Sequence, residues 1–155
     1  MNCIIRPLED IDQLLEWRKE VMTVVFGQPP SDELMAANKD YYSRHIADGS
    51  HIAVVAEIDG IRAGCGAVCL TEELPSPDNS SGRCGYIMNI YVRPEYRSQG
   101  VGHQIVRNLV TVARESGCDK IYLETTPGAR SLYNSIGFKE LPGIMKYEDV
   151  HNPES

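Results

Sequence analysis

The sequence predicts one mixed α/β domain whose central sheet is antiparallel near the amino terminus and parallel further along the chain. Two strand-like runs flank Asp59-Gly60, a dipeptide typical of a β-hairpin turn. Later, a strand, an amphipathic helix and a second strand follow one another, which forces a parallel pair joined by a right-handed crossover. Because no repeat, linker or low-complexity segment divides the chain, we expect residues 1–155 to form a single domain.

A short strand and two helices are expected before the hairpin. Residues 3–6 are typical of a strand, and Asp10 is placed to cap the following helix, with Gln13 where a capping-box partner would lie. Apolar residues then recur at helical spacing. A second helix is expected to begin near Ser31, after Pro29-Pro30, because acidic side chains in its first turn favour the positive end of the helix dipole.

The remaining elements follow from apolar periodicity and from turn residues. They make about four helices in all around one mixed sheet. In chain order we expect hairpin strands at 51–58 and 62–70, a polar loop at 71–85, a strand at 86–92, a helix from Gly100 to Gly117, a strand at 120–125, a short helix at 129–135 closed by Gly137, and a final hairpin from 138–141 and 144–148.

Composition argues against several classes of function. The 155 residues carry a formal net charge of −7, which argues against a nucleic-acid binder because phosphate contacts need a basic surface. No apolar stretch approaches the roughly 20 residues that span a membrane, and the amino terminus lacks a signal-like segment. We therefore expect a cytoplasmic protein that binds no membrane, in which the glycosylation sequon Asn79-Ser80-Ser81 carries no meaning.

The cysteines and histidines indicate neither disulfides nor a metal site. Five cysteines form no Cys-x-x-Cys pair, so they are expected to be reduced thiols. The four histidines show no ligand spacing with each other or with the cysteines. No metal is therefore expected.

The strongest functional signal is the turn Arg97-Ser98-Gln99-Gly100-Val101-Gly102, which follows a strand and opens an amphipathic helix. Its two glycines let the backbone curl around a ligand, and the free N–H groups of the first helical turn attract an anion. A P-loop is excluded because His103-Gln104 stand where it needs Lys-Ser/Thr, and a dinucleotide fingerprint because Ile105 replaces its third glycine. An ordinary strand-to-helix turn is the alternative.

Two segments carry a longer pattern. Residues 86–102, Tyr-Ile-Met-Asn-Ile-Tyr-Val-Arg-Pro-Glu-Tyr-Arg-Ser-Gln-Gly-Val-Gly, comprise an apolar strand, Val-x-Pro-x-Tyr-Arg and a Gln-Gly-x-Gly turn. Residues 129–138, Ala-Arg-Ser-Leu-Tyr-Asn-Ser-Ile-Gly-Phe, read Ala-x-x-Leu-Tyr-x-x-x-Gly-Phe. In this order they resemble the acetyl-coenzyme A signature and the later helix of the GNAT superfamily of acyl-CoA N-acyltransferases. With the elements between them, they cover about a third of the chain.

The resemblance implies the GNAT fold and a binding mode for acetyl-CoA. The strands at 86–92 and 120–125 would splay apart to admit its thioester arm, and the pantetheine amides would bond to the backbone of Ile90 and Val92. The pyrophosphate would rest on the glycine turn, with Arg97 adding charge, although a solvated arginine is the alternative. Thr126 replaces an asparagine found in many members. The implied cofactor-binding residues are Ile90, Tyr91, Val92, Arg97, Ser98, Gln99, Gly100, Val101 and Gly102.

Tyr133 and Asn89 are the catalytic candidates. In the family, the tyrosine matching Tyr133 lies near the sulfur and protonates the departing thiolate, to which a phenol with pKa ~10 is suited. A core tyrosine with a wet tip is the alternative. The strand before the turn lacks the glutamate that serves some members as base. Asn89 would hold a proton-carrying water or the substrate carbonyl, Glu124 is an acid at suitable depth, and Glu72 and Glu73 lie on a polar loop.

The resemblance thus implies an acyl-CoA-dependent N-acetyltransferase that moves an acetyl group directly to an amine in a ternary complex. The expected partners are acetyl-CoA and a small-molecule amine, with a homodimer as a further option. Residues 24–31, the loop at 71–85 and the turn at Pro142-Gly143 are expected to shape the acceptor pocket. Two alternatives stay open: a non-catalytic acyl-CoA sensor, and an acetyltransferase of protein N-termini or lysines.

Overall fold

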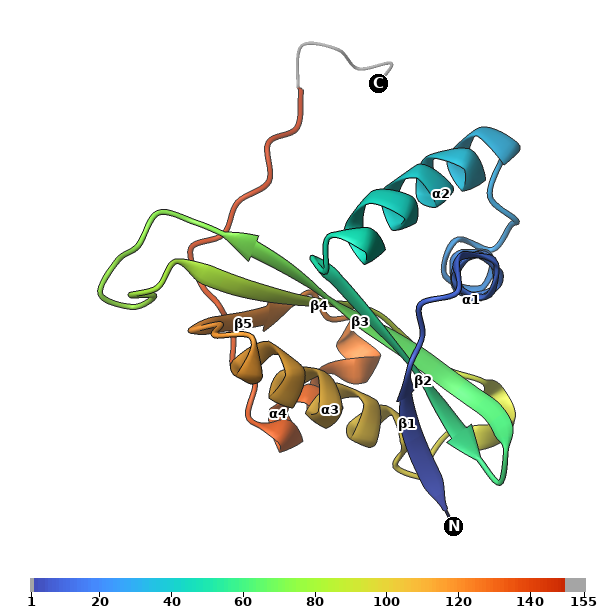
Figure 1. Cartoon of the computed structure of the whole chain (residues 1–155). Coiled ribbons are helices and arrows are strands. Elements are labelled where there is room, and N and C mark those ends of the chain that lie inside the picture. The colour runs from blue at the N-terminus through green and yellow to red at the C-terminus, as the bar shows by residue number, and fades with distance from the viewer. Residues whose placement is uncertain (1, 150–155) are drawn as a thin grey trace.

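A five-stranded sheet with strand order β1-β2-β3-β4-β5 forms the centre of the computed structural model, which describes residues 2–149. Figure 1 shows α1 and α2 on one face of this sheet and α3 and α4 on the other. The strands are β1 (Cys3–Pro7), β2 (His51–Ile58), β3 (Ile61–Glu72), β4 (Arg83–Val92) and β5 (Lys120–Leu123). The helices are α1 (Ile11–Phe26), α2 (Asp32–Ala47), α3 (Val101–Glu115) and α4 (Arg130–Ile136), with short 3₁₀ turns η1 (Pro94–Tyr96) and η2 (Pro127–Ala129).

The sheet has the predicted mixed topology. Strands β1 to β4 pair in antiparallel fashion, and β4 pairs with β5 in parallel. The parallel pairing ends at Ile87 and Leu123, whereas β4 continues to Val92. The two strands therefore separate beyond this point, which confirms the expected splay.

The helix boundaries follow the predicted capping residues. Asp10 Oδ1 accepts a hydrogen bond from the Gln13 N–H at 3.0 Å, and Ser31 Oγ accepts one from the Leu34 N–H at 3.1 Å. The Gln13 side chain does not complete a capping box, because its Oε1 accepts from Arg62 Nη2 at 2.6 Å. These caps satisfy backbone donors that a helix leaves free.

Two apolar cores hold the helices on the sheet. The face of α3 toward the sheet is almost fully buried through Val101, Ile105, Val106, Leu109 and Ala113, each at most 1% exposed. A Cβ atom added to Gly66 of β3 would lie 2.7 Å from Ile105 Cγ2, so glycine there permits the close approach of α3. The second core lies under α1 and α2 and includes Leu14, Trp17, Val21 and Tyr42.

A β-bulge in β4 lies at the start of the splayed region. Asn89 and Ile90 of β4 oppose the single residue Gly66 of β3. Asn89 has φ 58°, in the left-handed region that asparagine tolerates better than most residues. The bulge interrupts the alternation of side chains: Met88 packs toward the α1 side and Ile90 toward the α3 core.

Two sequence predictions about the loops are wrong. Strand β3 extends to Glu72 and β4 begins at Arg83, so the polar loop is shorter than 71–85. The predicted final hairpin is absent, because residues 138–149 contain no strand. Apart from Phe138, which packs against the core, their apolar residues find no face to bury against: Ile144 is 68% exposed and Tyr147 is 83% exposed. In Figure 1 this red segment runs away from the sheet.

Candidate active site

The turn before α3 presents its backbone to solvent. Residues 97–100 are exposed, and both Ser98 and Gly100 have positive φ angles, of 63° and 82°. Gly100 is the N-cap of α3, and no side chain among the described residues caps this helix end. The first N–H groups of α3 therefore point outward with the positive end of the helix dipole, a geometry that suits an anion.

Arg97 lies beside this turn and folds back on β4. Its Nε donates a hydrogen bond to the Val92 carbonyl oxygen at 3.0 Å, and its guanidinium carbon lies 6.0 Å from the centre of the Tyr91 ring. The side chain thus adds positive charge next to the turn. It also occupies one of the backbone acceptors predicted to bind pantetheine.

The end of β4 has an unpaired edge on the side of β5. Among residues 2–149, no β5 residue pairs with β4 beyond Ile87. Ile90 and Val92 pack their side chains against the α3 core, whereas Tyr91 lies on the opposite face, edge-on to Trp17 with ring centres 6.3 Å apart. The backbone groups of this edge can therefore accept an extended ligand without disturbing either core.

A cavity of about 310 Å³ lies where β4 and β5 separate. Its walls come from α1, from the bulge in β4, from the segment after β5 and from α4. Most of the lining is apolar, with a few polar side chains, as is typical of small-molecule sites. The lining residues are Arg18, Val21, Met22, Val25, Phe26, Ile87, Met88, Asn89, Ile90, Glu124, Thr126, Ala129 and Tyr133.

Tyr133 projects from α4 into this cavity. It is 8% exposed, and its ring packs edge-on against Phe138, with ring centres 6.0 Å apart. Burial raises the pKa of its phenol above 10.0. The hydroxyl therefore carries its proton at neutral pH and can donate it.

Asn89 lies at the bulge and is held by α1. Arg18 Nη1 donates a hydrogen bond to Asn89 Oδ1 at 2.8 Å, and Arg18 Nε donates to Asn38 Oδ1 at 3.2 Å. The side-chain oxygen of Asn89 is thus engaged, which leaves its amide Nδ2 as the group that can face a substrate carbonyl or a water.

The acidic candidates divide between the cavity and the loop. Glu124 lines the cavity. The pKa of the Tyr86 phenol is raised, first by the burial of Tyr86 and then by the nearby charge of Glu124. Glu73 instead pairs with Lys120 at 3.1 Å and accepts from Asn79 Nδ2 at 3.0 Å. These contacts lie at the paired end of β4, so the prediction that loop 71–85 shapes the acceptor pocket is wrong for this cavity.

Of the other segments predicted to shape the pocket, only one contributes. Val25 and Phe26, at the end of α1, line the cavity, whereas Pro142-Gly143 does not. The sequon Asn79-Ser80-Ser81 lies in the loop between β3 and β4. The Asn79 side chain is 1% exposed, so it cannot serve as a glycosylation acceptor in the folded protein.

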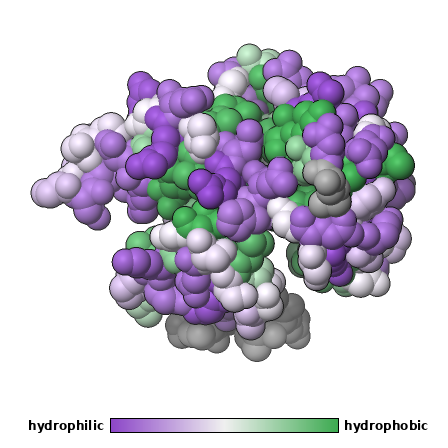
Figure 2. Space-filling model, turned by 90° about the horizontal axis from the view of Figure 1, so that it is seen from below, coloured by the Kyte–Doolittle hydropathy of each residue, from purple (hydrophilic) through white to green (hydrophobic). Residues whose placement is uncertain are grey.

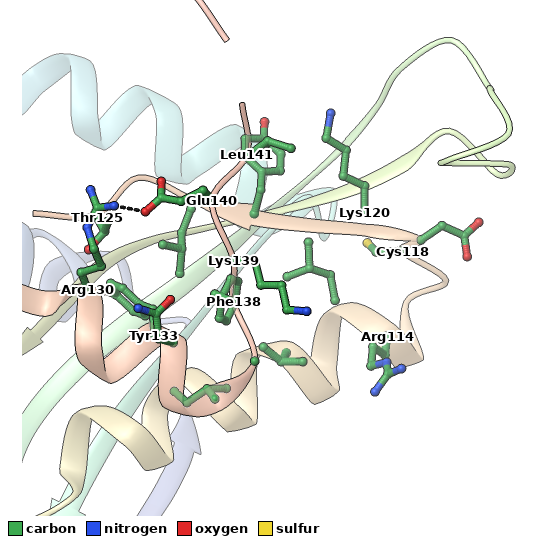
Figure 3. A pocket seen from close by; sticks show the side chains of 18 of the residues that line it. Arg114, Cys118, Lys120, Thr125, Arg130, Tyr133, Phe138, Lys139, Glu140 and Leu141 are labelled. Atoms are coloured by element: carbon green, nitrogen blue, oxygen red, sulfur yellow. Dashed lines mark ion pairs between the residues drawn. The ribbon is translucent and has the colours of Figure 1, made fainter. Parts of the chain in front are cut away.

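A larger cavity, of about 680 Å³, lies on the other side of β5. Figure 3 shows the segment from Phe138 to Leu141 crossing it, with an ion pair between Arg130 and Glu140. Tyr133 lines both cavities, but only the smaller one contains the bulge of β4. The smaller cavity is therefore the candidate acceptor site.

Other classes of site find no support in the described part of the chain. Residues 2–149 contain no group of three or more side chains that would hold a metal ion, and His151 lies outside them. No described helix is long and apolar enough to cross a membrane. Figure 2 shows hydrophobic residues in several separate patches of a mostly hydrophilic face.

Sequence reasoning missed Arg18. A signal was present, because Arg18 lies four residues after Leu14 and three before Val21, on the apolar face of α1. A charged side chain on such a face is unusual unless it has a partner or a function.

The sheet that splays beside an uncapped helix, with a cavity at the fork, is the architecture of an acetyl-CoA-dependent acyltransferase. The model of the acetyltransferase (GNAT) family matches residues 11–138. The chain belongs to this family.

Sequence relatives include other N-acetyltransferases, and a solved structure shares the fold. Glucosamine 6-phosphate N-acetyltransferase 1 of Oryza sativa is 30% identical over 138 residues, covering 88% of this chain and 81% of that protein. Thialysine N-epsilon-acetyltransferase of Bos taurus is 38% identical over 63 residues, or 39% of this chain. The alignments with the bovine protein and with a second rice protein, a probable glucosamine 6-phosphate N-acetyltransferase, span only 37% and 36% of those relatives. A predicted acetyltransferase of Clostridium acetobutylicum, crystallised with acetyl-CoA, shares the fold with a TM-score of 0.84 at 24% identity, covering 95% of this chain and 96% of that one.

Proposed function

We propose that this protein transfers an acetyl group from acetyl-CoA to the amine of a small molecule, directly within a ternary complex. The observation that carries the proposal is the convergence of three features: an uncapped N-terminus of α3, an unpaired edge of β4, and Tyr133 in the cavity between them. Family membership supports the same activity.

The residues present fit acetyl-CoA. The backbone amides from Ser98 to Gly102 and the Arg97 guanidinium would bind the pyrophosphate, because an uncapped helix N-terminus with a nearby arginine favours anions. The backbone around Ile90, Tyr91 and Val92 would bind the pantetheine amides as an added strand. The thioester would then lie at the fork, next to the cavity.

The cavity residues divide the proton transfers between them. Glu124 would take the proton of the incoming ammonium, which gives the neutral amine that attacks the thioester carbon. As the C–N bond forms and the C–S bond breaks, Tyr133 donates its proton to the sulfur. The attacking nitrogen releases a second proton, which restores the phenol through solvent, and Glu124 gives up its proton to bulk water. Asn89 Nδ2 would donate a hydrogen bond to the carbonyl oxygen.

A small acceptor is favoured by the size of the site. A volume of about 310 Å³ is at the lower end of ligand pockets. The rice and bovine relatives are named for glucosamine 6-phosphate and thialysine, which are both small amines.

Binding and turnover test the proposal separately. Calorimetric titration with acetyl-CoA is expected to show saturable binding and a raised Tm. A screen of small amines, read by thiol release, is expected to find turnover. Binding without turnover of any amine or peptide would indicate the sensor alternative, and turnover of peptides alone would indicate a protein acetyltransferase.

We further propose a cytoplasmic location and a homodimer. The five cysteines are all free thiols, which favours a reducing compartment. Within residues 2–149, the outer edge of β5 pairs with no strand, and the segment after α4 exposes Met145 at 94% and Tyr147 at 83%. An open strand edge with exposed apolar residues is a common interface between copies.

A further inference from the structure

Arg18 brings a positive charge into the candidate acceptor cavity. It lines the cavity from α1, among the apolar side chains of Val21, Met22, Val25 and Phe26. Its two hydrogen-bond acceptors, Asn38 Oδ1 and Asn89 Oδ1, are neutral amides. Amide partners orient a guanidinium without cancelling its charge, and the apolar surroundings strengthen any ionic contact made there.

The guanidinium is held in a fixed position by its neighbours. Asn38 Nδ2 donates to the Leu34 carbonyl at 2.8 Å, which points Asn38 Oδ1 at Arg18. Asn89 is set in place by the bulge and its positive φ. The two hydrogen bonds to Arg18 use two of its five N–H groups, so three remain for a ligand.

Arg93, a second arginine that contacts α1, differs from Arg18 because a carboxylate binds it. Arg93 forms two hydrogen bonds of 3.0 Å with the Glu20 carboxylate and lies over the Trp17 ring at 4.4 Å. Its charge is thereby neutralised within the protein. Among the described residues, no carboxylate forms an ion pair with Arg18.

We infer that the acceptor amine carries an anionic group, a carboxylate or a phosphate monoester, that binds Arg18. This inference rests on the proposed acetyl transfer and specifies its substrate class. Arginine binds both anions through paired N–H groups. Glu124, on another wall of the cavity, would face the ammonium of the same molecule. The cavity therefore selects amines with charges of both signs over purely cationic ones.

Matched pairs of amines test the inference with acetyl-CoA as donor. Glucosamine 6-phosphate is compared with glucosamine for the phosphate arm, and lysine with cadaverine for the carboxylate arm. The wild-type chain is expected to have a higher kcat/KM for the anionic member of at least one pair. Arg18→Gln is expected to reduce this preference by about 10- to 100-fold, the usual effect of losing a charged hydrogen bond.

Asn89→Asp provides a second variant of nearly unchanged size. It keeps the guanidinium but places a carboxylate against it, so it is expected to reduce the same preference even if Arg18→Gln does not fold. Arg62→Gln is the matched control, because Arg62 also bonds to an amide of α1, at 2.6 Å from Gln13, but lies outside the cavity. It is expected to retain the wild-type preference.

Failure of the anionic-substrate inference and failure of the proposed transferase activity give different results. Preference of the wild-type chain for glucosamine and cadaverine, or an unchanged preference in both Arg18→Gln and Asn89→Asp, would overturn the inference. Absence of acetyl-CoA binding, or of thiol release with every amine, would instead overturn the proposed transferase activity.

Discussion

At the scale of single residues, neutral hydrogen bonds and burial set the charge of the candidate site. Arg18 is oriented by two asparagine oxygens and keeps its charge. Tyr133 is buried, which raises its phenol pKa and keeps its proton in place. The cavity thus combines a fixed cation, a proton donor and the Glu124 carboxylate within an apolar lining.

Tyr133→Phe tests the proton donor. The substitution keeps the ring and its contact with Phe138, so acetyl-CoA affinity is expected to change less than twofold, whereas kcat is expected to fall about 100-fold. Stopped-flow thiol detection and calorimetry measure the two quantities. Tyr122→Phe, on β5 and outside the smaller cavity, is the matched control. An unchanged kcat in Tyr133→Phe would remove this residue from the mechanism.

His51 is expected to make stability depend on pH. It is 4% exposed, its Nδ1 lies 2.9 Å from Tyr41 Oη, and burial, with the charges of His45 and Arg18, lowers its pKa to about 4. The unfolded chain binds this proton near pH 6.5, so stability is complete above that pH and declines as the pH falls toward 4. The free energy of unfolding is expected to decrease by about 2 kcal/mol between pH 7 and pH 5.

Urea unfolding at the two pH values measures this effect. His51→Gln is expected to remove most of the pH dependence. His103→Gln is the control, because His103 lies on α3, on the other side of the sheet from α2, and this variant is expected to retain the pH dependence. Equal pH dependence in wild type and His51→Gln would assign the effect to other groups.

At the scale of elements, the opening in the sheet comes from a short strand beside a long one. Strand β5 has four residues and β4 has ten, so β4 continues past the end of β5 at Leu123 with only β3 beside it. The bulge at Asn89 lies in that extension and turns its side chain toward α1. Helix α3 starts close to the end of β4 and directs its uncapped N-terminus outward.

Ser98→Asp tests the anion-binding role of the turn before α3. Aspartate tolerates the positive φ at this position, but its charge opposes the pyrophosphate. The dissociation constant for acetyl-CoA is expected to rise about fivefold or more, since like charges at close range cost about 1 kcal/mol or more. Ser98→Asn is the neutral control with the same backbone preference and is expected to stay within threefold of wild type. Equal affinity in both variants would place the pyrophosphate elsewhere.

At the scale of the whole molecule, the sheet divides two helical layers, and its two edges differ. Helix α1, which lies with α2 on one face, supplies one wall of the candidate acceptor cavity, and α3 and α4 lie on the face proposed to bind acetyl-CoA (Figure 1). The β5 edge is bordered by the larger cavity and by the segment from Phe138 to Leu141. This edge is the surface at which the proposed homodimer would form.

The proposed homodimer predicts a mass twice the 17.3 kDa of the chain by light scattering. A double substitution, Met145→Asp with Tyr147→Asp, is expected to shift the mass toward the monomer. Both side chains are more than four-fifths exposed, so the folded monomer loses little. Leu74→Asp, at a residue 90% exposed in the β3–β4 loop, is expected to leave the mass unchanged. A monomeric wild-type chain would contradict the dimer.

Much of the fold was predictable because its signals are local. Asp10 and Ser31 cap their helices as expected, and Asp59-Gly60 forms the hairpin turn between β2 and β3. The final hairpin was not predictable, since its alternating pattern needs a face to cover, and residues 139–149 are all exposed. The loop at 71–85 was expected to shape the acceptor pocket but does not line the smaller cavity, because its position depends on contacts with distant residues such as Lys120.

The turn before α3, the parallel crossover and the tyrosine helix could be predicted from the chain alone, because each depends on residues close together in the sequence. The charge of the candidate acceptor cavity depends instead on tertiary packing. Arg18 and Asn89 are 71 positions apart and meet through the packing of α1 on a bulge in β4. No local pattern encodes that contact, since it arises from the burial of two separate apolar faces.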